Sequence, residues 1–179
     1  SESNVAKQLR KNNGDINDSY ILFLKSVFCN DNFQSAYEKY HYIYLRQPIQ
    51  LFGEKAVAVD ISIINKLGKL LDNRFIIREH PLNINDVYDD KFSNITIDLK
   101  SNMWELECLS IKEKCVLIGM FSTAQISPKI LFGYEPFVVF LFNLFPLDEH
   151  LKMNEQKTVE RFRNLYLNKN RIFVPNNMD

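Results

Sequence analysis

The chain has 179 residues, a length that suits one domain built around a single core. Its 22 basic and 22 acidic residues cancel, so bulk charge favours neither nucleic acid nor an anionic membrane as a partner. The three cysteines are odd in number and lack metal-ligand spacing, which favours reduced thiols and a cytoplasmic location over a disulfide framework.

The first 40 residues predict a helical lead-in or linker remnant. A helix is expected over residues 18–28, where apolar side chains recur at helical spacing: Tyr20, Phe23, Leu24 and Phe28. Because the chain opens at Ser1 with neither Met nor a charged and apolar leader, we expect an excised piece of a longer protein. Residues 41–179 are expected to form one α/β domain.

Short apolar runs and helical patterns alternate through that domain. Strands are predicted over residues 41–46, 74–78, 94–97, 115–119, 137–142 and 171–174. Helices are predicted from Asp60, as N-cap, through Leu71, and over residues 103–111, 128–132 and 147–167. The longest apolar stretch, residues 137–145, is far shorter than the roughly 20 residues of a membrane span. The alternation predicts an open, mostly parallel Rossmann-like sheet with helices on both faces.

Ligands of such sheets bind beyond the carboxyl ends of the strands, so the residues that follow each strand are the first candidates. His80 and Pro81 follow the strand at 74–78, where the histidine could meet a phosphate or simply cap a turn. Ser122 and Thr123 follow the strand at 115–119 and precede a helix. Their hydroxyls could help to cradle a phosphate or serve as ordinary helix caps.

Acidic residues near the other strand ends are candidates for sugar and proton contacts. Glu105 and Glu107 begin a predicted helix, where a carboxylate could bind ribose hydroxyls or only complement the helix dipole. Glu105 is preferred, because Glu107 is expected in the packed body of the helix. Asp60 is the candidate general base, with Glu54 in the preceding loop as a second acid; the alternative for Asp60 is a plain N-cap.

Several signatures are absent from the sequence. It has no glycine-rich phosphate loop, no paired metal-ligand spacing and no Gly-x-Ser-x-Gly elbow. Dehydrogenase, NTPase, zinc enzyme and serine hydrolase are therefore disfavoured, and neither a metal nor a cofactor is expected.

The order of three motifs resembles a known family. Gln47–Pro48, then Ile76–Pro81 (IIREHP), then Gly119–Ala124 (GMFSTA) are similar to the C-terminal nucleotide-sugar-binding domain of bacterial sialyltransferases of glycosyltransferase family 52 and the related polysialyltransferases. The resemblance covers about residues 40–175. It implies one half of a GT-B fold and transfer of sialic acid from CMP-sialic acid to a glycan hydroxyl. Transfer would proceed with inversion and without a metal, in synthesis of capsule polysaccharide or lipooligosaccharide.

The resemblance also implies roles for the candidate residues. His80, with Pro81, would contact the CMP phosphate and stabilise or protonate it as it leaves. Ser122 and Thr123 would hold that phosphate from the other side, and Glu105 would match the acid that binds the ribose. The family's acidic-acidic-glycine motif has no match here, so Asp60 is the substitute for the base, unless the base belongs to the other half of the enzyme.

The implied partners are a sugar nucleotide, a glycan acceptor and an N-terminal GT-B domain, with peripheral association of the full enzyme at the inner face of the cytoplasmic membrane. Most of the aromatic residues Tyr37, Tyr40, Tyr42, Tyr44 and Trp104 are expected in the core, and a homodimer through an aromatic face formed by them is an alternative. Two other functions stay open. One is a different GT-B glycosyltransferase or an epimerase that prefers UDP; the other is a non-catalytic α/β module of capsule synthesis.

Overall fold

The structure is a computed structural model that describes residues 26–27, 35, 37–83, 92, 95–98, 102–111 and 114–178. Of the helix predicted over residues 18–28, only Ser26 and Val27 lie within the described residues. Residues 37–39 form a turn, and Tyr37 and Tyr40 are buried in the domain core. The predicted boundary at residue 41 therefore falls inside the packed structure.

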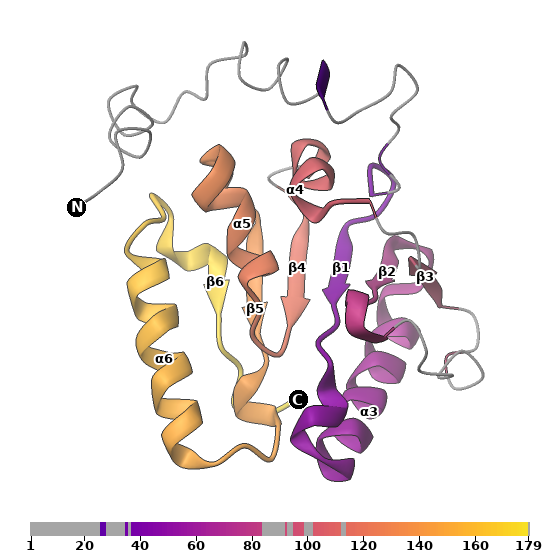
Figure 1. Cartoon of the computed structure of the whole chain (residues 1–179), viewed down its shortest axis with the longest axis vertical. Helices are drawn as coiled ribbons and strands as arrows, with labels where there is room; N and C mark the ends of the chain where they lie inside the picture. Colours follow the sequence, from indigo (N-terminus) through magenta and orange to yellow (C-terminus); the bar gives the residue numbers. More distant parts are fainter. Residues whose placement is uncertain are drawn as a thin grey trace.

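A six-stranded parallel sheet forms the centre of the molecule, with its strands pointing the same way (Figure 1). The strands are β1 Tyr42–Leu45, β2 Phe75–Arg78, β3 Thr96–Asp98, β4 Val116–Gly119, β5 Phe137–Phe140 and β6 Ile172–Phe173. Their order is β3-β2-β1-β4-β5-β6. This arrangement confirms the predicted open parallel sheet, and it places the reversal of strand order between β1 and β4.

Helices connect the strands on both faces of the sheet. They are α3 Glu54–Leu71, α4 Trp104–Glu107, α5 Thr123–Phe132 and α6 Glu149–Arg163, and short 3-10 turns cover Ile49–Phe52, Asp72–Arg74, Pro81–Asn83, Cys108–Ser110, Phe142–Leu144 and Lys169–Arg171. Right-handed crossovers put α3 on one face and α5 with α6 on the other, because the chain moves in opposite directions from β1 and from β4. Within the described residues, no helix combines the length and apolar character that crossing a bilayer requires.

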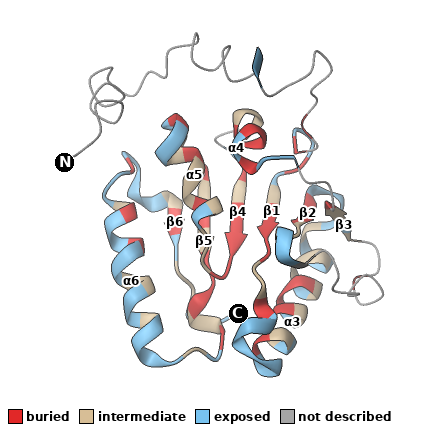
Figure 2. Cartoon of the chain, in the orientation of Figure 1, coloured by how far each residue is buried: buried red, intermediate tan, exposed pale blue. Residues whose placement is uncertain are grey.

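The central strands are mostly buried, whereas the outer sides of α3 and α6 are exposed (Figure 2). The parallel register puts Tyr44, Ile118 and Val139 on one face, where α3 packs through Ile63 and Ile64. The neighbouring strand residues face α5 and α6, and they include Ile43, Leu117, Val138 and Phe140, all fully buried. The rings of Phe162 in α6 and Phe140 pack edge-on, with their centres 6.2 Å apart.

The prediction that a helix begins at Asp60 is wrong. The helix α3 begins at Glu54 after Gly53, whose φ of +87° is a backbone conformation that glycine adopts freely. Three good helix formers, Glu54, Lys55 and Ala56, begin the first turn, and Ala56 is already fully buried there. Asp60 therefore lies inside the helix, and Glu54, predicted in a loop, is its first residue.

The helix predicted from Pro128 also begins earlier, at Thr123, so Pro128 lies inside α5. Proline has no N–H to donate to the carbonyl four residues before it, which here belongs to Ala124. The indole Nε1–H of Trp104 donates to that carbonyl instead, at 2.7 Å. A contact from α4 therefore satisfies the backbone group that the proline leaves without its helical donor.

α3 covers only part of its face of the sheet. Beside it, over β4 and β5, the sheet is covered by the C-terminal residues of the described chain. A cavity of about 320 Å³ lies there between the sheet, α3 and residues 175–178, with mostly apolar lining. Two polar contacts hold the C-terminal segment: Lys66 Nζ donates to the Met178 carbonyl at 2.6 Å, and Asn143 Nδ2 donates to Asn176 Oδ1 at 2.9 Å. Val116 and Val139 in this cavity are only half-buried.

Candidate functional site

The structure brings the two predicted phosphate motifs to the same edge of the sheet. His80 follows the carboxyl end of β2, and Ser122 and Thr123 follow the carboxyl end of β4. Because β1 lies between β2 and β4, the two motifs flank it on either side. Ser122 also borders the reversal of strand order, which is where ligands of open α/β sheets bind.

His80 caps a tight turn and keeps one ring nitrogen available. The backbone N–H of Leu82 donates to His80 Nδ1 at 3.2 Å, and residues Pro81–Asn83 form a 3-10 turn. Because Nδ1 accepts this hydrogen bond, the proton of the neutral ring must be on Nε2. The ring is partly exposed, so Nε2–H is a donor that a ligand at the strand ends could use.

Ser122 is the N-cap of α5. Its Oγ accepts the Ala124 N–H at 3.2 Å, and Gln125 Oε1 accepts the Ser122 N–H at 3.0 Å, which completes a capping box. The Ser122 hydroxyl still carries a proton to donate. Thr123, the first residue of the helix, is exposed and could add a second hydroxyl.

Gln125 is a structural residue of the site that sequence reasoning missed. It is fully buried, and its Nε2 donates to the Val139 carbonyl of β5 at 2.9 Å. Its side chain therefore fixes the start of α5 to the strand beside it. The Ser-x-x-Gln spacing at 122–125 is the capping-box pattern and was the available signal.

Asp60 is neither an N-cap nor an accessible base. It is 2% exposed, Arg46 Nε lies 2.8 Å from its Oδ2, and the Tyr44 hydroxyl donates to its Oδ1 at 2.6 Å. Burial raises the pKa of the Asp60 carboxyl, although Arg46 and Tyr44 oppose that effect. With both oxygens bound inside the protein, this carboxylate cannot reach an acceptor hydroxyl at the sheet edge.

Arg46 is the centre of this buried network, and sequence reasoning did not identify it. Its guanidinium also binds Glu79 Oε1 at 2.6 Å, and it lies 5.4 Å from the centre of the Phe92 ring. Glu79 is the residue directly before His80. The network therefore joins the ends of β1 and β2 to α3.

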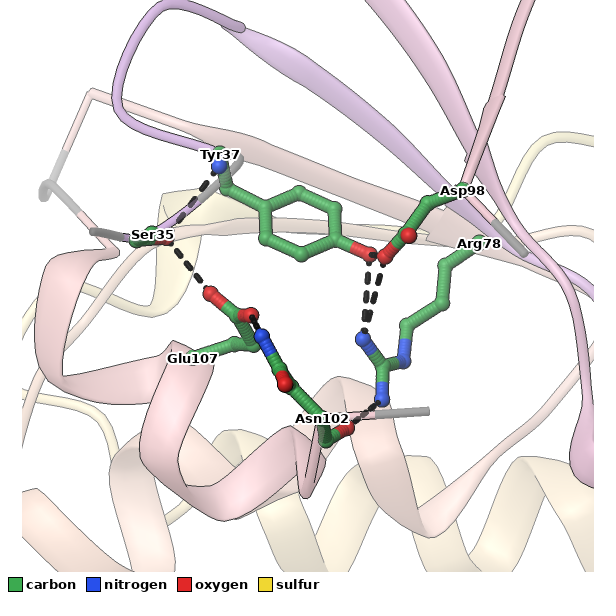
Figure 3. Close-up of polar contacts among 6 residues, drawn as sticks. All are labelled: Ser35, Tyr37, Arg78, Asp98, Asn102 and Glu107. Carbon is green, nitrogen blue, oxygen red and sulfur yellow. Dashed lines mark hydrogen bonds and ion pairs between the residues drawn. The ribbon is translucent and has the colours of Figure 1, made fainter. Parts of the chain in front are cut away.

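The two candidate glutamates of α4 differ sharply in burial. Glu107 is 1% exposed and accepts hydrogen bonds from Ser35 Oγ at 2.6 Å and Asn102 Nδ2 at 2.9 Å (Figure 3). The expectation that it is packed is confirmed. Glu105 is exposed on α4, and its contact with a ribose stays a prediction.

A second polar cluster joins residue 37 to the ends of β2 and β3 (Figure 3). The Tyr37 hydroxyl donates to the Asp98 carboxylate, and Arg78 Nη1 lies 3.0 Å from that hydroxyl and 3.4 Å from Asp98 Oδ2. Burial raises the pKa of Tyr37 well above its usual range, an effect that Arg78 opposes. Arg78 also lies 5.2 Å from the centre of a Trp104 ring. The cluster fastens the segment before β1 to the sheet.

The expectation that most of the candidate aromatic rings lie in the core is confirmed, so these residues form no continuous exposed face. Tyr37, Tyr40, Tyr44 and Trp104 are 1–7% exposed, and Tyr42 is partly buried. Their rings pack inside the domain, as the edge-on contact of Tyr37 and Trp104 at 5.7 Å shows.

No protein-family model, no curated protein and no solved structure matched this chain in comparisons with each. The functional assignment therefore depends on the geometry of the sheet edge and on the resemblance carried by the His80 and Ser122 motifs.

Proposed function

We propose that this chain is the nucleotide-binding domain of a glycosyltransferase that transfers sialic acid from CMP-sialic acid to a glycan hydroxyl. The observation that supports the proposal most is the position of His80 and Ser122. They follow strands on either side of β1, at one edge of a sheet whose order reverses beside Ser122. The resemblance of the same two motifs to sialyltransferases supplies the choice of donor.

The phosphate of CMP would lie between the two motifs. As the bond from the sugar to the phosphate oxygen breaks, negative charge grows on the phosphate, and donors aimed at it lower the barrier. His80 Nε2–H would donate from one side and the hydroxyls of Ser122 and Thr123 from the other. The ten-residue helix α5 adds the positive end of its dipole at the same place.

The acceptor would attack the anomeric carbon from the face opposite the phosphate, which inverts the configuration. Its oxygen forms the new glycosidic bond while its proton passes to a general base. Since Asp60 is buried in an ion pair with Arg46, the proposal assigns the base and the acceptor site to a second GT-B domain. Glu105 keeps its proposed role at the ribose, and the full enzyme would work at the inner face of the cytoplasmic membrane.

One observation favours a second candidate function, a non-catalytic α/β module of capsule synthesis. Ser122 caps α5 and His80 accepts from the Leu82 N–H, so both residues already have a structural role without any ligand. In that case neither motif would bind a nucleotide.

Calorimetric titration with CMP separates the two functions. UMP serves as the matched control for the nucleobase, and UDP tests the alternative donor. The variants His80→Ala and Thr123→Ala test the contacts on the two sides of the phosphate. We expect CMP to bind more tightly than UMP and UDP, and each variant to lose roughly 1.5–3 kcal/mol for one charge-assisted contact.

Thr123 is preferred to Ser122 as a probe because its side chain makes no helix cap. Circular dichroism must show that both variants remain folded. If UDP is bound in preference to CMP, a different glycosyltransferase or an epimerase is favoured. If the folded chain binds none of the three nucleotides, the proposed function is wrong and the non-catalytic module is favoured.

A further inference from the structure

The backbone that leads into His80 is held from both neighbouring strands. The Arg46 N–H donates to the Arg78 carbonyl at 3.0 Å, which ties it to the end of β1. The Glu79 N–H donates to the Asp98 carbonyl at 3.4 Å, which ties it to the end of β3. Residues 78 and 79 are therefore fixed on both sides immediately before the histidine.

The side chain of Glu79 is fixed as well. Its Oε1 lies 2.6 Å from Arg46 Nη1, and the Glu79 and Arg46 side chains are 10% and 1% exposed. The Arg46 guanidinium is itself held by Asp60 Oδ2 at 2.8 Å. A planar guanidinium that binds two carboxylates has little freedom to rotate, so it defines where Glu79 can lie.

We infer that Arg46 is a positioning residue for His80, acting through Glu79. This inference rests on the proposed function, because it concerns how His80 is presented to the phosphate. Arg46 is too deeply buried to touch a ligand at the sheet edge. By fixing Glu79 it fixes the start of the turn in which the Leu82 N–H meets His80 Nδ1, and that contact keeps the proton on Nε2.

Glu79→Gln tests the inference with little change of shape. The amide removes the charge that faces Arg46 but leaves the pair between Arg46 and Asp60 intact. The matched control is Glu135→Gln, because Glu135 Oε1 lies 2.7 Å from Lys129 Nζ in a comparable part-buried pair. Glu135 precedes β5 and therefore lies at the opposite edge of the sheet from His80.

The first measurement is the NMR spectrum of the imidazole ring nitrogens. The His80 signals are identified among those of the three histidines of the chain by their loss in the His80→Ala variant. We expect the wild-type spectrum to show the Nε2–H form of the neutral ring, and Glu79→Gln to mix the two tautomers. Glu135→Gln should leave the His80 signals unchanged. The second readout is CMP affinity, expected to fall about tenfold in Glu79→Gln, as when an outer-shell partner of a binding histidine is lost.

The two readouts separate the inference from the proposed function. If CMP does not bind the wild-type chain, the proposed function fails, and the His80 spectrum alone decides whether Arg46 and Glu79 position the ring. Unchanged His80 signals in Glu79→Gln, or equal changes in Glu79→Gln and Glu135→Gln, would overturn the inference even where CMP binds. Arg46→Lys, which keeps the charge but loses the planar fork, should reproduce the mixed tautomers if the fork is what matters.

Discussion

The backbone carbonyl oxygen of Leu45 lies 2.8 Å from the position that a β-carbon on Gly119 would occupy. Leu45 ends β1 and Gly119 ends β4, the two strands between which the order of the sheet reverses. The same β-carbon would lie 3.2 Å from Gln125 Oε1, the atom that accepts the Ser122 N–H. The absence of a side chain at Gly119 therefore permits both the close approach of the strands and the capping box.

Gly119→Ala is expected to lower the free energy of unfolding by about 1–3 kcal/mol, because backbone must move to admit the methyl group. Gly68→Ala is the control, since its new methyl group would lie 2.4 Å from Cδ1 and 2.8 Å from Cγ1 of Ile95, which are side-chain atoms that can rotate away without movement of the backbone, and alanine favours the helix. Urea unfolding measures both. A Gly119→Ala protein as stable as the parent would show that the strand ends at the candidate site can separate freely.

Asp60→Asn is expected to lower the free energy of unfolding by about 3 kcal/mol, because it leaves the buried Arg46 with less compensating charge. The triple variant Arg46→Met, Asp60→Leu, Glu79→Gln should lose less, since it removes all three charges of this network together. Chemical unfolding of the two variants measures the difference. If Asp60→Asn instead keeps full stability and abolishes sialyl transfer by the full enzyme, the case against Asp60 as the base fails.

The architecture was predictable because buried parallel strands are short apolar runs whose ends are marked by polar residues. Each predicted strand is present, and His80 and Ser122 stand at the strand ends where the sequence placed them. Parallel pairing brings those ends to one edge whatever the side chains between them. For that reason the location of the candidate site followed from the strand pattern alone.

The polar networks were not predictable, because they join residues far apart in the sequence. Tyr37 and Asp98 are 61 residues apart, and Arg46 and Glu79 are 33 apart. An aspartate is suited both to a helix N-cap and to a buried ion pair, so the residue type at position 60 could not distinguish these two roles. The two roles are distinguished by the partner Arg46, which the fold places beside Asp60 at the carboxyl end of β1.

Glu135→Gln is expected to destabilise the protein at neutral pH and to matter less in acid. Burial opposes ionisation of Glu135, but hydrogen bonds from Lys129 and from the N–H groups of Leu167 and Asn168 outweigh it and lower its pKa. A carboxyl whose native pKa is lowered contributes stability above its ordinary pKa, near 4.3, and loses that contribution as the pH falls through the native value.

The difference in unfolding free energy between the parent and Glu135→Gln should therefore shrink steadily below about pH 4, as the parent carboxyl takes up a proton first in the unfolded and then in the folded state. Urea unfolding at a series of pH values from neutral to acid measures it. A difference that stays constant over this series would mean that the contact of Glu135 with Lys129 contributes no charge-dependent stability.

Ser122 carries both a structural and a proposed ligand role, and two substitutions separate them. Ser122→Ala removes the cap and should lower the free energy of unfolding by about 1 kcal/mol, together with nucleotide affinity. Ser122→Asp should keep the cap, because a carboxylate oxygen can accept the Ala124 N–H, and should still lose CMP binding, because its charge repels the phosphate. Thermal unfolding and calorimetry on the same samples measure the two properties. If Ser122→Asp binds CMP as tightly as the parent, Ser122 is a helix cap alone, and the phosphate, if it binds at this edge, must be held by His80 and Thr123.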